Sequence, residues 1–138
     1  AFYLQRAGVP HELDGAGTTN LPLAKAAAAA RRHPIGVEFH CNAAASPSAT
    51  GAECLSAPKD KALAARISSA IALTLGIRDR GAKLENAGQH HRLAFVRSGG
   101  IVVELFFLTN PADLGAEDAR KWVAAREVAA VLAGEAGA

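Results

Sequence analysis

The 138-residue sequence contains no methionine, only two cysteines and few aromatic residues, which make up 5% of the chain. Because the initiator methionine is absent, we expect Ala1 to be a cut or processed end, so a signal peptide cannot be read from this sequence. Cys41 and Cys54 are too few to build a disulfide scaffold and lack Cys-x-x-Cys spacing. No uninterrupted apolar run approaches the roughly 18 residues that cross a bilayer, so we predict no membrane insertion.

The charges nearly cancel, with 15 Lys and Arg against 13 Asp and Glu and a net charge of +2. Such a balance gives no strong field to attract a nucleic acid or an anionic membrane. The basic residues are also scattered, without the aromatic residues of a base-stacking platform. We therefore predict no nucleic-acid partner. The length and the 50% apolar content suit one globular domain over residues 1–138.

Apolar periodicity alternates between strands and helices along the chain. Residues 35–40 alternate as in a strand, Leu63, Ile67, Ile71 and Leu75 recur as in a helix that ends at Gly76, and residues 101–107 form a nearly continuous apolar strand that suits a central position. The alternation predicts an α/β fold, with a three-layer, twisted, mostly parallel sheet flanked by helices. Further predictions are the last turns of a helix over 1–7, an edge strand over 9–13, a helix over 21–32, a strand over 51–56, an exposed loop over 78–91, a strand over 93–96, and a helix from 117 to about 134.

Glu104 is the first candidate for chemistry, because it lies inside the apolar run 101–107. A buried carboxylate has a large desolvation cost unless it is paired, protonated or bound to a metal. His40 ends a predicted strand, and ligands of open α/β sheets bind beyond the carboxyl ends of strands. Both residues are candidates for metal binding or proton transfer. The alternative is structural, with the carboxylate held by a buried arginine and the imidazole by a hydrogen bond.

Three other motifs carry less weight. Cys41 and His40 are adjacent, and neighbours on an extended strand point to opposite faces, so they do not form a nucleophile–base dyad. His90 and His91 lack the spaced partners of a zinc signature and are expected to be exposed. The loop 14–17 lacks the full glycine spacing and the Lys-Ser/Thr pair of a phosphate-binding loop.

Three stretches, taken in order, resemble one protein family. They are Val-Glu-Phe-His-Cys-Asn-Ala at 37–43, Arg-Gly-Ala-Lys at 80–83, and Val-Glu-Leu-Phe-Phe-Leu-Thr-Asn at 103–110, followed by Asp113. This order is similar to that of the zinc-dependent N-acetylmuramoyl-L-alanine amidases of the amidase-3 type. The similarity runs from about Phe2 to Leu132, and Glu-x-x-Phe-x-Thr-Asn is its most specific part.

The resemblance implies a hydrolase that cleaves peptidoglycan between N-acetylmuramic acid and the L-alanine of the stem peptide. It implies that His40 is the last zinc-ligand histidine and that Glu104 is the catalytic glutamate. It also implies zinc as cofactor, peptidoglycan as partner, and action in the periplasm or the extracellular cell wall, or on a host cell wall during phage lysis. Zinc-bound water with a pKa of about 7 and a nearby carboxylate suit amide hydrolysis.

The sequence departs from the family pattern in its zinc ligands. Family members carry an earlier Gly-His-Gly segment and a following glutamate, and neither is found here. Residues 2–9 match the end of the helix that follows, so we expect the first strand, the start of that helix and both ligands to lie upstream of Ala1. In addition, Glu38 stands where the family commonly has serine, and Cys41 replaces a small residue.

One protein ligand cannot hold a catalytic zinc, which normally takes three and a water. The spacing of His11, Glu12 and His33 does not bring them to His40. Two alternatives therefore stand beside the amidase: a non-catalytic peptidoglycan-binding or interaction module, and a related zinc carboxypeptidase whose loop 78–91 reads a free carboxylate.

Overall fold

The computed structural model describes residues 1–15, 19, 21–86 and 93–137 of the chain. Its centre is a four-stranded sheet with the strand order β1-β4-β2-β3. The strands are β1 (Gly36–Asn42), β2 (Ala52–Ser56), β3 (Asp79–Leu84) and β4 (Gly100–Phe107). β4 pairs in parallel with β1 and antiparallel with β2, and β2 pairs in parallel with β3. The mostly parallel α/β sheet predicted from the sequence is confirmed.

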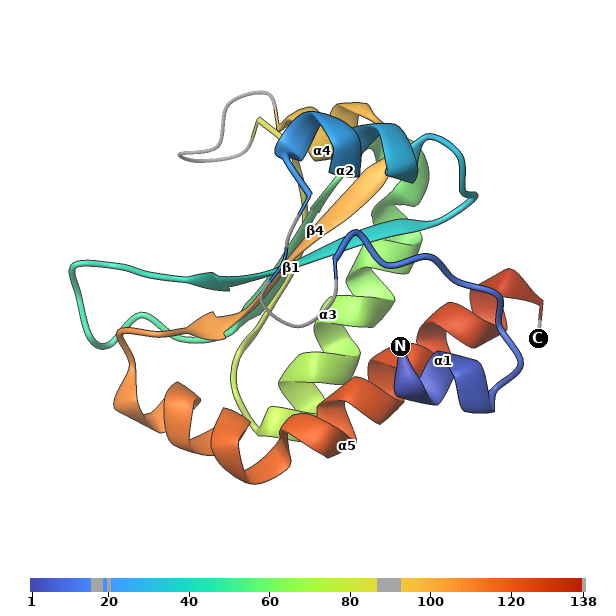
Figure 1. Ribbon diagram of the computed structural model, residues 1–138. Helices are drawn as coiled ribbons and strands as arrows, with labels where there is room; N and C mark the ends of the chain where they lie inside the picture. Colours follow the sequence, from blue (N-terminus) through green and yellow to red (C-terminus); the bar gives the residue numbers. More distant parts are fainter. Residues whose placement is uncertain (16–18, 20, 87–92, 138) are drawn as a thin grey trace.

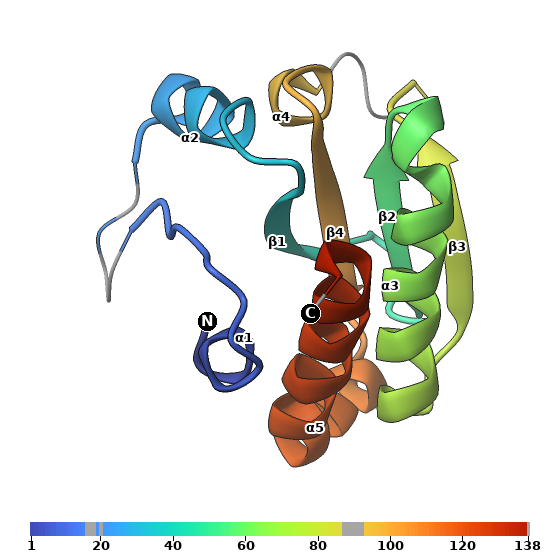
Figure 2. The same ribbon diagram turned by 90° about the vertical axis from the view of Figure 1, so that its right-hand side faces the viewer.

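Helices cover both faces of this sheet (Figures 1 and 2). Helices α3 (Lys61–Leu75) and α5 (Pro111–Ala136) pack on one face, and α1 (Phe2–Arg6) packs against α5. Helices α2 (Leu23–Ala30) and α4 (Ala94–Arg97) pack near the other face, around Leu55 and Val102. A short 3-10 turn over Pro58–Asp60 precedes α3. None of the described helices is long and apolar enough to span a bilayer.

The central strand β4 is buried along nearly its whole length. Ile101 and Val103 face the core formed with α3 and α5, and Val102 faces the smaller core with α4. A strand that is covered on both faces must be apolar on both faces, which explains the unbroken apolar run in the sequence. Glu104 is therefore a carboxylate in a strand that is covered on both faces, and it is only 6% exposed.

Helix α3 forms as its sequence predicts. Its four periodic residues, Leu63, Ile67, Ile71 and Leu75, are all buried against the sheet. Gly76 ends the helix with a φ of 71°, in the left-handed region that glycine adopts without steric cost. The segment 1–7, predicted as the end of a helix, is also helical as α1.

Two predictions in the second half of the chain are wrong. The segment predicted as an exposed loop over 78–91 contains the edge strand β3, which pairs in parallel with β2. Its polar side chains gave the sequence the appearance of a loop. The segment predicted as a strand over 93–96 is the helix α4, and short apolar runs do not distinguish a strand from a helix. Phe95 of α4 lies on the backbone of Gly100, where a Cβ atom would clash with the ring.

Two boundaries and one further predicted strand also differ from the structure. Helix α5 starts at Pro111, six residues before Glu117, because the side chain of Asn110 caps it by accepting from two backbone N–H groups. The segment 9–13 is not a strand, and Glu12 in it binds Arg32 and His33, which follow α2. Strand β1 continues two residues beyond His40.

Candidate functional site

The sheet places His40 and Glu104 side by side. His40 of β1 is the register partner of Glu104 in β4, and Glu53 of β2 is the partner of Glu104 on its other side. Register partners on neighbouring strands point to the same face. The two residues singled out by the sequence therefore share one face of the sheet, and a third ionisable residue lies level with them.

The three side chains differ in their access to solvent. The carboxylates of Glu104 and Glu53 are buried, with 6% and 4% of each residue exposed. The His40 side chain is 47% exposed, and its Nε2 lies 3.4 Å from Oε1 of Glu38. The site is thus enclosed on the β2 side and open on the β1 side.

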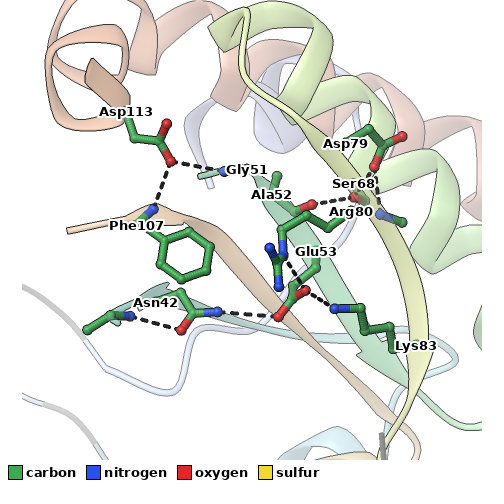
Figure 3. A network of polar contacts seen from close by, with 12 residues as sticks. Asn42, Gly51, Ala52, Glu53, Ser68, Asp79, Arg80, Lys83, Phe107 and Asp113 are labelled. Atoms are coloured by element: carbon green, nitrogen blue, oxygen red, sulfur yellow. Dashed lines mark hydrogen bonds and ion pairs between the residues drawn. The ribbon is translucent and has the colours of Figure 1, made fainter. Parts of the chain in front are cut away.

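Glu53 is held by donors from two other strands (Figure 3). Asn42 Nδ2 donates to its Oε1 at 3.3 Å, Arg80 Nε donates to its Oε2 at 2.7 Å, and Lys83 Nζ also donates to Oε2. Burial acts to raise the pKa of Glu53, but the hydrogen bonds and charges of Lys83 and Arg80 outweigh it, so the pKa lies below its ordinary value of 4.5. Glu53 is therefore charged at neutral pH.

The sequence reading missed Glu53, although a signal for it was present. Glu53 lies in the predicted strand 51–56 between small and apolar residues. The desolvation argument that singled out Glu104 applies equally to it. Its partners Arg80 and Lys83 were assigned to a loop, so nothing in the sequence connected them with this carboxylate.

A third buried carboxylate, that of Asp113, fixes the loop beside the site. Asp113 accepts from Gly51 N at 3.0 Å, from Phe107 N at 3.1 Å and from Thr50 Oγ1 at 2.5 Å. These bonds join the start of β2 and the end of β4 to the first turn of α5. The loop 43–51 is thereby held against the carboxyl end of β4.

The described residues do not by themselves form a zinc site. Among them, no group of three or more His, Cys, Asp or Glu side chains could hold a metal ion. Glu12 and His33, considered as substitute ligands, bind each other, with 2.6 Å between Oε2 and Nε2. A catalytic zinc at His40 would require further ligands.

The remaining sequence candidates do not join the site. Cys41 is exposed and unpaired with Cys54, and partial burial and the charges of Glu117 and Glu104 raise the pKa of its thiol. A raised pKa is the opposite of what a nucleophilic cysteine needs. His90 and His91 lie outside the described residues, and so does part of the loop 14–17.

Comparisons with known proteins agree on one family. The family profile described as N-acetylmuramoyl-L-alanine amidase matches residues 2–133. A structure from Neisseria meningitidis, assigned as an N-acetylmuramoyl-L-alanine amidase, has 39% sequence identity and a TM-score of 0.88, over 99% of this chain and 79% of that one.

More distant structures share the fold. An N-acetylmuramoyl-L-alanine amidase of Nostoc punctiforme has 22% identity and a TM-score of 0.77, over 96% of this chain and 73% of that one. An amidase of the same description from Clostridium difficile 630 has 20% identity and a TM-score of 0.73, over 96% of this chain and 74% of that one. No curated protein sequence gave a significant match.

Proposed function

Because this chain belongs to the N-acetylmuramoyl-L-alanine amidase family, we propose that it hydrolyses the amide bond between N-acetylmuramic acid and the L-alanine of the peptidoglycan stem peptide. Residues 1–138 then act as an amidase-like catalytic domain on the periplasmic or extracellular cell wall, or on a host wall during phage lysis. The observation that carries the proposal is the pairing of His40 with Glu104 on one face of the sheet.

In this proposal Glu104 moves the proton. Its carboxylate accepts a proton from the attacking water and delivers it to the nitrogen of the leaving L-alanine. Positioned general acid–base groups accelerate reactions by about 10² to 10⁴. The enclosure of Glu104 in β4 supports this role, because a rigid, buried carboxylate is held in one position for both transfers.

We further propose zinc as the cofactor, with His40 as one ligand. When bound, zinc lowers the pKa of water to about 7 and polarises a carbonyl group. The exposed imidazole of His40, two residues before the carboxyl end of β1, supports this part of the proposal. The other ligands would have to come from beyond the described residues.

The first experiment is an assay of the full-length protein on purified cell wall. We expect Glu104→Gln, which keeps the shape of the side chain and removes its charge, to lower the rate by about 10³. The new amino group on L-alanine is counted by amine labelling. Asp118→Asn, at an exposed carboxylate of α5, is the matched control and should leave the rate unchanged. A wild-type rate in Glu104→Gln would refute the assigned role.

A non-catalytic module is the second candidate, because the described residues lack a group of three ligands. Zinc titration followed by calorimetry separates the two functions. Stoichiometric binding at micromolar zinc, reduced in His40→Ala, favours the enzyme. Peptidoglycan binding without zinc uptake or product release favours the module.

A further inference from the structure

Two buried carboxylates lie directly opposite each other in the centre of the sheet. Glu53 and Glu104 are register partners across the antiparallel pair of β2 and β4. Cβ atoms of such partners lie about 5 Å apart, and like charges in this arrangement destabilise a sheet. A charged Glu53 opposite a second carboxyl group is therefore unfavourable unless other contacts of Glu53 compensate for it.

The contacts of Glu53 reach across the sheet to the strand that carries His40. One oxygen accepts from Asn42 at the end of β1, and the other accepts from Arg80 and Lys83 in β3. β4 lies between β1 and β2, so the Asn42–Glu53 hydrogen bond spans the strand of Glu104. Glu53 thus connects both edge strands of the sheet (Figure 3), and it is the register partner of Glu104.

Contacts of the Asn42 side chain can affect the position of His40, because Asn42 lies two residues after His40 on β1. The β1–β4 register shifts between His40 and Asn42, so the strand is irregular at this point. Irregular pairing in a strand redirects side chains and is often found beside active sites. The backbone oxygen of Asn42 accepts from Leu108 N at 2.8 Å, and its side chain is bound to Glu53. The two contacts together fix the end of the strand.

We infer that Glu53 is a positioning residue for the reaction at Glu104: held by Arg80 and Lys83, it binds Asn42 and so fixes His40 relative to Glu104. This inference rests on the function proposed above. A structural role alone does not need a charge here, because buried ion pairs replaced by apolar residues often leave stability unchanged or improved. Positioning needs an oxygen that is held in place and accepts from Asn42, because a misplacement of about 1 Å can lower a rate 100-fold.

Kinetics of the full-length protein test the inference. We expect Glu53→Ala to lower kcat about 100-fold with KM changed less than about twofold, because alignment is lost and substrate contacts are kept. Glu53→Gln keeps an oxygen that can accept from Asn42, so its kcat should fall only about tenfold. Asn42→Ala should match Glu53→Ala, and the double variant should be no slower than the slower single variant, because both break one connection.

Ser68→Ala is the matched control for lost stability. Ser68 is buried behind the same strand and donates to Ala52 O at 3.1 Å and to Asp79 at 2.6 Å, and neither acceptor is a hydrogen-bond partner of the Glu53 carboxylate. It should lower the melting temperature and leave kcat unchanged. An equal loss of kcat in Ser68→Ala and Glu53→Ala would show that only stability is affected, and it would overturn the inference. If Glu53→Ala does not fold, the kcat of Asn42→Ala decides.

A spectroscopic measurement keeps this inference separate from the proposed function. If the wild-type protein releases no product, the proposed function fails, but the ring resonances of His40 can still be recorded by NMR. We expect Glu53→Gln and Asn42→Ala to shift these resonances and Ser68→Ala to leave them in place. Unshifted His40 resonances in both site variants would refute the positioning role.

Discussion

The strands β1 and β2 flank β4, and each places one residue level with Glu104, yet they differ in their exposure to solvent. All five residues of β2 are buried, whereas none of the seven residues of β1 is. His40 and Cys41 are exposed on β1, and Glu53 and Cys54 are enclosed on β2. One side of the candidate site is therefore a packed, ion-paired wall, and the other side is open.

This difference has a functional meaning for an enzyme that acts on a polymer. A glycan strand with stem peptides cannot enter a closed cavity, so the site needs one accessible side. That side is β1, where the His40 side chain is 47% exposed. The enclosed β2 side can instead hold groups in fixed positions, which is what the hydrogen bonds of Glu53 do.

Thiol labelling should show the largest difference between the two strands. We expect Cys41 to react with iodoacetamide in the folded protein. Cys54 should react roughly 10,000-fold more slowly, because the strand must first open at a cost of 5 kcal/mol or more. Burial also raises the pKa of the Cys54 thiol to about 12, so little thiolate is present. Mass spectrometry of labelled peptides over time gives both rates.

Unfolding in urea is the control for the labelling experiment. Both cysteines should then react at similar rates, because only the fold distinguishes them. Similar rates in the folded protein would mean that β2 opens as readily as β1, and the packed wall described above would not exist.

The next largest difference between β1 and β2 should be in how much an ionic contact on each strand contributes to the free energy of unfolding. Removing one partner of a buried ion pair costs about 3 to 5 kcal/mol, but Arg80 and Lys83 are 28% and 34% exposed, so we expect about 2 to 3 kcal/mol for Glu53→Ala. Glu38→Ala removes the partner of the exposed His40 side chain on β1, at a separation of 3.4 Å, and should cost about 0.5 kcal/mol or less. Urea unfolding followed by circular dichroism measures both, and equal losses would contradict the comparison.

The same contrast explains how much of the fold could be predicted from the sequence. The periodic residues of α3 and the apolar run of β4 are buried in the core, so their local sequence patterns suffice to predict the helix and the strand. β3 has no such pattern, because Arg80 and Lys83 are stabilised by Glu53, which lies about 30 residues earlier in the chain. Polar residues whose partners are distant in sequence look like those of a loop.

The candidate site was predicted in the same incomplete way. The sequence singles out His40 and Glu104 as candidates because each stands at a conspicuous place in a strand and matches a family motif. Their pairing depends on β1 and β4 being neighbours, although about 60 residues separate them, and the topology alone shows this. Glu53 was missed because its function depends on strands β1 and β3, not on its own segment.

The pH dependence of stability should show the smallest difference. The pKa of Glu53 is lowered in the folded protein from an ordinary value of 4.5, so its ionised form stabilises the fold above that pH. This stabilisation is lost as the pH falls below 4.5 and through the folded pKa of Glu53. It amounts to about 1.4 kcal/mol for each pH unit that separates the folded pKa from the ordinary value. The difference in unfolding free energy between wild type and Glu53→Gln should therefore be largest at neutral pH and shrink in acid. Urea unfolding at a series of pH values from 7 to 3 measures both curves, and a difference for Glu53→Gln that stays constant into acid would show that its charge does not stabilise the wall.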